Sequence, residues 1–256
     1  MLKIASWNVN SLKVRLPQVL QWLESARPDI LGLQETKLAD ENFPAAEIEE
    51  AGYHVHYSGQ KTYNGVALLS KTEASDILTD LPGIEDPQRR VIGATVGGLR
   101  VLNLYVPNGQ EVGSDKFDYK LHWLGCLSQY VQEQLKHYPK LVVMGDFNIA
   151  PDERDVHDPI IWEDHVLFSG PERDAFQGLL SHGLQDTFRL FEQADKSYSW
   201  WDYRANAFKR NLGLRIDHIL ASEPLAEQCR ASYVDKEPRK WERPSDHAPV
   251  VAEFED

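Results

Sequence analysis

The chain has 256 residues, of which 42% are hydrophobic and 26% are charged, a composition typical of a globular protein. Its net charge of −13, from 27 basic and 40 acidic side chains, argues against proteins that bind nucleic acid or anionic membranes through overall charge. The two cysteines lack CxxC spacing, which disfavours a zinc site or a disulfide framework and fits a reducing compartment.

The N-terminus lacks the apolar core of a signal peptide, and no apolar stretch approaches the roughly 20 residues of a membrane span. No linker-like segment or internal repeat divides the chain, and no pattern indicates an obligate dimer. We therefore expect a cytoplasmic monomer without a membrane partner, built as one domain over residues 1–256.

Short segments rich in β-branched, aliphatic and aromatic residues recur along the chain and predict strands. In chain order, these strands are expected over residues 3–9, 29–35, 54–59, 65–70, 91–96, 99–106, 140–147, 214–221 and 248–254. Helical patterns occupy 16–26, 119–137 and 172–181, the first with apolar residues at the spacing of one buried face. Many strands with few helices predict a mixed α/β protein in which two packed sheets carry helices on their outer faces.

Six of these segments end in polar side chains. Asn8 and Asn10 alternate along the first strand, so both point to the same face. Asp146 and Asn148 repeat this spacing, with Phe147 directed to the opposite face. The other four segments contribute Glu35, Tyr105, Asn108, Asp217, Asp246 and His247. Because sheets can bring such ends together at one edge, the set predicts a shared site.

Each of these residues also has a structural interpretation when it is considered alone. An asparagine at a strand end is a common turn former, Glu35 can be a solvated strand end, and Tyr105 can be an amphipathic core residue. Asp217 lies inside an apolar strand, where a carboxylate needs a partner, either an arginine or a functional group. By alternation, His218 is expected to pack on the other face, which leaves His247 as the better partner.

Nine stretches carry a family resemblance, and they occur in order from residue 6 to residue 250. They are SWNVNSLKVRL, PDILGLQETK, YNGVALLSK, DPQRRVI, NLYVPNGQ, KLVVMGDFNIAPDERDVHDP, SWWDYR, GLRIDHILAS and PSDHAPV. Together they resemble the exonuclease III family of abasic-site endonucleases, within the deoxyribonuclease-I-like metal phosphoesterases. The resemblance implies a four-layer α/β sandwich. It also implies a hydrolase that cleaves damaged double-stranded DNA 5′ to abasic sites, with 3′→5′ exonuclease and 3′-end trimming activity.

The resemblance further implies a Mg²⁺ site, at which Mn²⁺ can substitute. Magnesium prefers oxygen ligands and is usually held by one or two carboxylates, and Glu35 is the expected principal ligand. The residues expected at this site are Asn8, Glu35, Asp146, Asn148, Asp246 and His247.

The resemblance also assigns roles in phosphodiester cleavage, which requires a positioned water and donors to the phosphoryl oxygens. Asp146 is expected to position or deprotonate the attacking water, and Asn148 to donate to a phosphoryl oxygen without adding charge. His247 is expected to donate as well, with Asp217 behind it to set its tautomer.

Tyr105 and Asn108 are expected to complete the cradle around the phosphate. The general base stays open between Asp146, ionised Tyr105 and His247. An aspartate with an unshifted pKa of about 3.9 is a weak base at neutral pH, so Asp146 would need burial or a metal-activated water.

Contacts to DNA are implied for a larger set of residues. This set comprises Asn10, Lys61, Tyr63, Asn64, Gly65, Arg89, Arg90, Trp200, Leu214 and Ile216. Trp200, Leu214 and Ile216 would surround an extruded abasic sugar. Extruding this sugar costs little free energy because no base pair must be broken. Structural alternatives are a simple turn at YNG, solvated loop charges at the arginine pair, and a core position for Trp200, although Trp201 is expected to fill that core role.

Further basic residues group in the sequence at Lys116 with Lys120, at Lys209-Arg210 and over residues 239–243, where they could follow a DNA backbone. The segment 155–171 is expected to influence the choice between abasic-site incision and 3′-end trimming.

Two other functions share parts of these motifs. One is a related hydrolase of inositol phosphates, sphingomyelin or poly(A) RNA, which the tryptophan-rich and basic segment before residue 214 disfavours. The other is an inactive nucleic-acid-binding relative, which the six complete polar strand ends disfavour.

Overall fold

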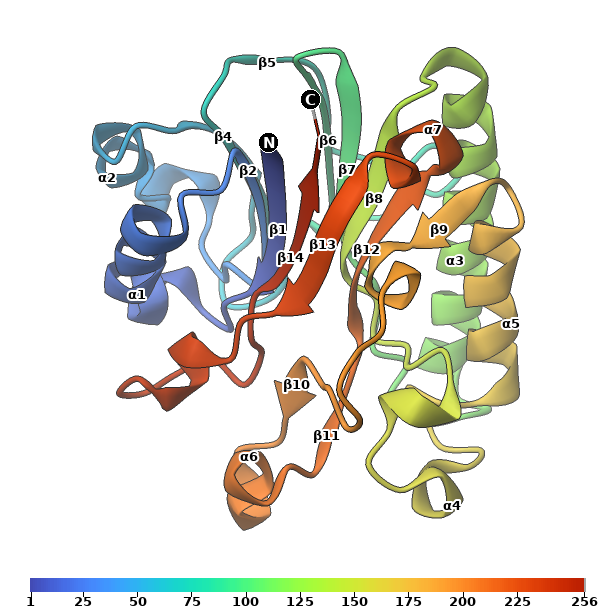
Figure 1. The fold of residues 1–256 in the computed structure, drawn as a ribbon. Helices are drawn as coiled ribbons and strands as arrows, with labels where there is room; N and C mark the ends of the chain where they lie inside the picture. The colour runs from blue at the N-terminus through green and yellow to red at the C-terminus, as the bar shows by residue number, and fades with distance from the viewer. Residues whose placement is uncertain (256) are drawn as a thin grey trace.

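Two packed β-sheets form the centre of the molecule in a computed structural model that describes residues 1–255 (Figure 1). The first sheet has the order β13 (Cys229–Val234), β14 (Val250–Phe254), β1 (Leu2–Asn8), β2 (Ile30–Gln34), β4 (Val66–Ser70) and β3 (His54–Ser58). The second has the order β5 (Ala74–Leu78), β6 (Val91–Val96), β7 (Leu99–Tyr105), β8 (Leu141–Asp146), β12 (Asp217–Ser222) and β9 (Leu184–Asp186). Both are mixed, with parallel pairs at β1–β2 and β7–β8.

Helices cover the outer face of each sheet, which gives four layers (Figure 1). On the first sheet these are α1 (Leu12–Ala26) and α2 (Ala45–Glu50), and on the second α3 (Asp115–His137) and α5 (Gly170–Leu180). The short elements are α4 (Pro159–Trp162), α6 (Ala207–Arg210), α7 (Glu223–Ala226), β10 (Trp200–Trp201) and β11 (Gly213–Leu214). Single 3-10 turns lie at Asp40–Asn42, Glu153–Asp155, Thr187–Leu190, Arg204–Asn206 and Glu237–Lys240. The α/β sandwich predicted from the sequence is confirmed.

Side-chain alternation sorts the core into layers. In β8, Val142 and Met144 lie in the layer between the sheets, whereas Leu141 and Val143 pack under α3 and α5. The same alternation in the neighbouring strands directs every second residue into the inter-sheet layer. Polar residues at the ends of these series are therefore directed into that layer.

All nine expected strands and all three expected helices are present, with shifted ends. The strand expected over 214–221 begins at Asp217, because Gly213 and Leu214 pair with β10 instead. Sequence patterns missed β5, β9 and β13, because β5 and β13 are edge strands with exposed side chains and β9 has only three residues. Cys126 and Cys229 are both free and buried, as expected.

One expectation about a single residue was wrong, and one alternative that the sequence left open is not realised. Lys120 does not join Lys116 in a surface basic cluster, because its side chain is 0% exposed and pairs with Glu172. Among residues 1–255, Asp217 has no arginine partner, which was one of its two possible partners: the neighbouring Arg215 pairs with other carboxylates instead.

None of the helices among residues 1–255 is both long enough and apolar enough to cross a membrane.

Candidate active site

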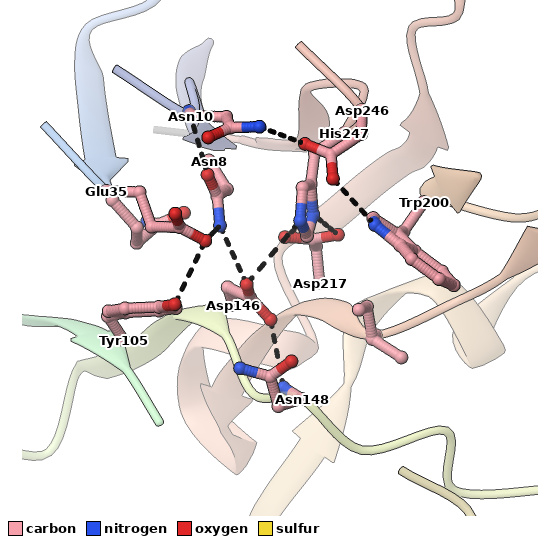
Figure 2. A network of polar contacts seen from close by, with 12 residues as sticks. Asn8, Asn10, Glu35, Tyr105, Asp146, Asn148, Trp200, Asp217, Asp246 and His247 are labelled. Carbon is pink, nitrogen blue, oxygen red and sulfur yellow. Dashed lines mark hydrogen bonds and ion pairs between the residues drawn. The ribbon is translucent and has the colours of Figure 1, made fainter. Parts of the chain in front are cut away.

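The polar strand ends meet at one end of the inter-sheet layer (Figure 2). Asp146 continues the inward-facing series of Val142 and Met144 along β8. The strand register pairs Asp146 with Asp217 on one side and with Tyr105 on the other. Three residues distant in the sequence thus become neighbours, as their strand-end positions predicted.

Asn8 lies at the centre of this group, at the end of β1. Its side-chain amide nitrogen donates to Glu35 Oε1 at 2.9 Å and to Asp146 Oδ2 at 2.8 Å (Figure 2). Its amide oxygen accepts from the backbone N–H of Asn10 at 3.0 Å. Asn8 therefore bridges carboxylates that belong to the two different sheets.

Glu35 is held at the edge of the group by several donors. Tyr105 donates its hydroxyl to Glu35 Oε1 at 3.0 Å, and Lys37 Nζ lies 3.1 Å from Glu35 Oε2. Burial alone would raise the pKa of this carboxyl, but the hydrogen bond from Asn8 and the charge of Lys37 lower it below its usual value. Glu35 is thus ionised at neutral pH, as a metal ligand must be.

The donor set fits a hard divalent cation. Ligand atoms of Glu35, Asp146 and His247 all lie within 4.8 Å of one another. The two carboxylates supply the anionic oxygens that such cations prefer, whereas His247 can act as a ligand only in its neutral form. Asn8 directs its nitrogen, not its oxygen, toward these carboxylates. Asp246 is occupied by other partners, accepting from Asn10 at 3.1 Å and from the Trp200 indole at 3.0 Å.

Left-handed backbone conformations recur at this site. Asn10, Glu35, Lys37 and Asn148 have φ values of 43°, 51°, 55° and 49°. Such conformations cost energy for residues with a Cβ and persist where surrounding contacts enforce them. The strand ends therefore turn sharply at the site to present these side chains.

His247 is oriented by a buried carboxylate. Its Nδ1 lies 2.9 Å and 3.1 Å from the two oxygens of Asp217, and its Nε2 lies 3.7 Å from Asp146 Oδ2. Ser199 donates its hydroxyl to Asp217 at 2.6 Å and accepts from the backbone N–H of Asp217 and of Ile216. Burial alone would lower the pKa of His247, but the carboxylates of Asp217 and Asp146 raise it to about 10.

Asp146 and Tyr105 have altered acidities because both are buried. Burial raises the pKa of Asp146 to about 7, against the opposing charge of His247. Burial, together with the neighbouring Glu35 and Asp146, raises the pKa of Tyr105 well above its usual value. Of the three residues considered as general base, Asp146 thus titrates near neutral pH, whereas Tyr105 keeps its proton there and His247, with its raised pKa of about 10, already carries one.

Asn108 and Asn148 lie together beside these residues. Asn148 accepts from Asn108 at 3.4 Å, donates to the carbonyl of Val106 at 2.9 Å, and donates its backbone N–H to Asp146 Oδ1 at 2.9 Å. Both asparagines are therefore fixed next to Asp146, as the sequence predicted.

The residues expected to bind DNA differ in their solvent exposure and in their contacts within the protein. Tyr63 is 67% exposed and Lys61 is exposed, whereas Gly65 is buried, with φ of 93° and no room for a Cβ beside Thr36. Arg90 is engaged within the protein: it bonds Gln88, donates to the carbonyl of Tyr105 at 3.1 Å and covers the Tyr105 ring at 4.9 Å.

Other members of the expected DNA-binding set have partners of their own. Arg89 lies 3.6 Å from Asp80, and the side chain of Asn64 donates to Gln60 at 3.1 Å. Asn10, already bonded to Asp246, also accepts from Lys37 at 2.6 Å.

An apolar cluster lies beside the polar group. Leu214 and Ile216 are buried in it, and Trp200 packs against it while remaining partly exposed. Trp200 also forms an isolated β-bridge with His247, which ties the cluster directly to the site. Trp201 is fully buried, as expected for the core member of the pair.

Sequence reasoning missed Ser199 and Lys37. Ser199, in the stretch SYSWW, and Lys37, two residues after Glu35, have no sequence pattern that distinguishes them from ordinary surface residues. Only the contact of β12 with the segment before β10 reveals Ser199 as a partner of Asp217.

Comparisons with known proteins agree with this geometry. The chain is 40% identical over 266 residues to exodeoxyribonuclease III of Haemophilus influenzae, with 99% of this chain and 100% of that protein covered. Among solved structures, the 3′ phosphatase NExo from Neisseria, bound to a product DNA hairpin, superposes with a TM-score of 0.98 at 49% identity. An AP endonuclease from Archaeoglobus fulgidus superposes with a TM-score of 0.97 at 43% identity, and both solved chains are covered over 100% of their length and of this chain. The model of the endonuclease/exonuclease/phosphatase family matches residues 5–247, and the chain belongs to that family.

Proposed function

We propose that this protein is a Mg²⁺-dependent DNA repair hydrolase, with Mn²⁺ as a substitute metal. It cleaves duplex DNA 5′ to abasic sites and also removes nucleotides, phosphates and blocking groups from 3′ ends. The observation that carries the proposal is the buried Asp146 between Asn8 and His247, with the carboxylate of Glu35 within reach of the same cation. Relatives with nuclease and phosphatase names support DNA as the substrate. We propose a cytoplasmic monomer in which residues 1–256 act as one catalytic domain.

Glu35 and Asp146 would hold the cation, which would neutralise charge on the phosphoryl oxygens and make a bound water more acidic. Asp146 orients the attacking water and accepts its proton, because a pKa near 7 suits a general base at neutral pH. His247 donates from Nε2 to a phosphoryl oxygen, since Asp217 occupies its Nδ1.

Neutral donors complete the cradle around the phosphate. Tyr105 retains its proton, which it donates to Glu35 in this structure and would turn toward the reacting phosphate when substrate is bound. Asn148 and Asn108 add donors without adding negative charge. Trp200, Leu214 and Ile216 receive the extruded sugar, and Asn10, Lys61, Tyr63, Asn64, Gly65, Arg89 and Arg90 lie along the DNA path.

A version of this function dominated by 3′-end trimming is the second candidate. The likeness to a 3′ phosphatase at 49% identity, against 43% for an AP endonuclease, favours it. The two versions share the same catalytic residues and differ in the DNA that they accept.

One set of assays tests the proposal. The protein is incubated with an abasic duplex, a nick bearing a 3′ phosphate, a recessed 3′ end and an inositol polyphosphate, with Mg²⁺ or with chelator. We expect cleavage of DNA only when the metal is present, and the ratio of the first two rates separates the two versions. Undiminished activity in chelator, or turnover of the inositol phosphate alone, would refute the proposal.

Asp146→Asn should reduce the rate on every DNA substrate by at least about a thousandfold while the protein stays folded, because it removes the proton acceptor. Circular dichroism and thermal unfolding check the fold, and single-turnover cleavage measures the loss. Retention of more than a tenth of the wild-type rate would show that another group is the base.

A further inference from the structure

Lys120 and Glu172 form an ion pair that is fully buried beneath the site. Both side chains are 0% exposed, and they join α3 to the start of α5, which lie next to each other on the second sheet (Figure 1). A buried ion pair costs desolvation energy that its mutual attraction barely repays, so an apolar pair of similar size would stabilise the fold as well. The pair therefore calls for an explanation other than stability.

The remaining hydrogen bonds of Lys120 supply one. Its Nζ donates to the backbone carbonyl of Asn108 at 3.0 Å and to that of Asn148 at 2.7 Å. These are the two asparagines whose side chains bond each other beside Asp146. The ammonium group of Lys120 thus holds the backbones of the two loops that carry Asn108 and Asn148.

The backbone at both loops depends on this support. Asn148 has a φ of 49°, in the left-handed region, and its carbonyl is held in this conformation by the hydrogen bond from Lys120. Gly109, with a φ of 90°, follows Asn108, and a Cβ at Gly109 would lie 3.0 Å from Cδ of Lys120. The stem of the lysine therefore occupies the space that the glycine leaves open.

Glu172 extends the same connection to a third segment. Its Oε1 accepts from the backbone N–H of Leu167 at 3.0 Å, and its Oε2 accepts from the N–H and hydroxyl of Ser169 at 3.1 Å and 2.5 Å. Leu167 in turn accepts, at its carbonyl, the N–H of Ala150 at 2.7 Å. The end of the segment 155–171 is therefore tied to the loop that carries Asn148.

We propose that the Lys120–Glu172 pair is a positioning device for the reaction, which sets the side chains of Asn108 and Asn148 where the phosphate is bound. This inference rests on the proposed function, because it assigns the asparagines to phosphate binding. Lys120 touches no substrate and acts through the two loop carbonyls. Misplacement of catalytic groups by about 1 Å can cost about a hundredfold in rate, so loss of this support should reduce kcat more than it changes KM.

A double-variant comparison separates positioning from stability. Lys120→Met alone leaves Glu172 buried without a cation, so both the melting temperature and kcat should fall. Lys120→Met combined with Glu172→Gln removes both charges, and the melting temperature should recover by at least half of the loss. In this double variant kcat should stay at least about tenfold below wild type, with KM changed by less than about threefold. Recovery of kcat in step with the melting temperature would overturn the proposal.

The exposed pair Lys136–Glu133 on α3 provides the matched control. Lys136→Met with Glu133→Gln should leave kcat, KM and the melting temperature unchanged. If Lys120→Met fails to fold, the double variant alone still decides the outcome through its kcat.

Amide hydrogen exchange tests the inference without any assay of activity. The N–H groups of Gln110, Asn148 and Ala150 are all hydrogen-bonded in the two loops. In the double variant their exchange should quicken by at least about tenfold, while that of the β8 amides stays as in wild type. Unchanged exchange in the double variant would overturn the positioning role. If the double variant shows faster loop exchange but the wild-type protein does not cleave DNA, only the proposed function is refuted.

Discussion

Single side chains at the site owe their chemistry to their immediate partners. His247 and Asp217 are the clearest example, because Asp217 holds Nδ1 and leaves Nε2 directed toward Asp146. Ser199 in turn satisfies the carboxylate of Asp217. The charge state of the His247 imidazole therefore depends on Asp217, a residue 30 positions earlier in the chain.

Asp217→Asn should reduce kcat between about 10² and 10⁴-fold, because an amide neither favours the imidazolium nor fixes its tautomer as a carboxylate does. The KM should change far less, since the phosphate contacts of the other residues remain. Steady-state cleavage of an abasic duplex or a 3′-phosphate nick measures both values. Asp174→Asn, on the exposed surface of α5, is the matched control, and equal effects of the two substitutions would contradict the assigned role.

Whole elements are held in place by buried charges as well as by apolar packing. Arg215, just before β12, pairs with Asp155 at 2.7 Å and with Asp186 at 2.7 Å, which joins the segment after β8 to the end of β9. His218 completes this network: its Nδ1 lies 3.0 Å from Arg215, and its Nε2 lies 2.8 Å from the carbonyl of Ile149. His218 had been expected to pack on the face opposite Asp217, and it is fully buried there.

The network predicts a pH-dependent contribution of His218 to stability. Burial and the charge of Arg215 lower the pKa of His218 to about 4. Between pH 6.5 and 4 the unfolded chain binds a proton at this histidine and the folded chain does not, so the free energy of unfolding falls as the pH falls. Relative to His218→Asn, wild type should lose up to about 3 kcal/mol across this range.

Denaturant unfolding of both proteins at pH 7, 6, 5 and 4.5 measures this difference. Because the comparison is with a variant that lacks only this histidine, contributions from other titrating groups cancel. A difference that stays constant across the range would show that His218 takes up its proton equally in the folded and unfolded protein, which contradicts the lowered pKa.

At the scale of the whole molecule, the site requires the two sheets to lie at a fixed separation. Asn8 ends β1 and Glu35 directly follows β2 of one sheet, whereas Asp146 and Tyr105 end β8 and β7 of the other. Figure 2 shows these side chains pointing toward one another. Asn103 of β7 crosses the layer to donate to the carbonyls of Leu33 and Ala67 at 3.0 Å and 2.9 Å. Hydrogen bonds between the sheets therefore set how close the two halves of the site can come.

Gly32→Ala tests this spacing. A Cβ at Gly32 would lie 2.6 Å from Asn103 Oδ1 and 2.8 Å from Cε of Met144, so the side chains that cross between the sheets, or the sheets themselves, must shift to accept it. We expect a loss of about 1–3 kcal/mol in the free energy of unfolding, together with weaker cleavage. Gly125→Ala on α3, where no atom lies within 4 Å, should instead be neutral or stabilise by up to about 1 kcal/mol. A stable, fully active Gly32→Ala protein would show that the spacing is not tight.

The sequence by itself determined the fold class and most of the site. Alternation along strands and the polar residues at their ends are local properties, so Asp146, Asn148, Glu35 and His247 could be proposed as a set without coordinates, and the family resemblance implied their roles. The strand ends predicted that these side chains would meet, but which of them contact one another is a consequence of the strand order and register, which local patterns do not contain.

Only the tertiary structure decided the roles of residues whose local sequence looks ordinary. Lys120 lies in a polar stretch of α3 and resembles a surface lysine, yet it is buried because Glu172 and two loop carbonyls surround it. Arg90 resembles a free DNA-binding arginine, yet it is committed to Gln88 and Tyr105. The physical reason is the same in both cases: whether a charge is solvated or buried depends on partners from distant segments, which meet only when the sheets and helices have packed.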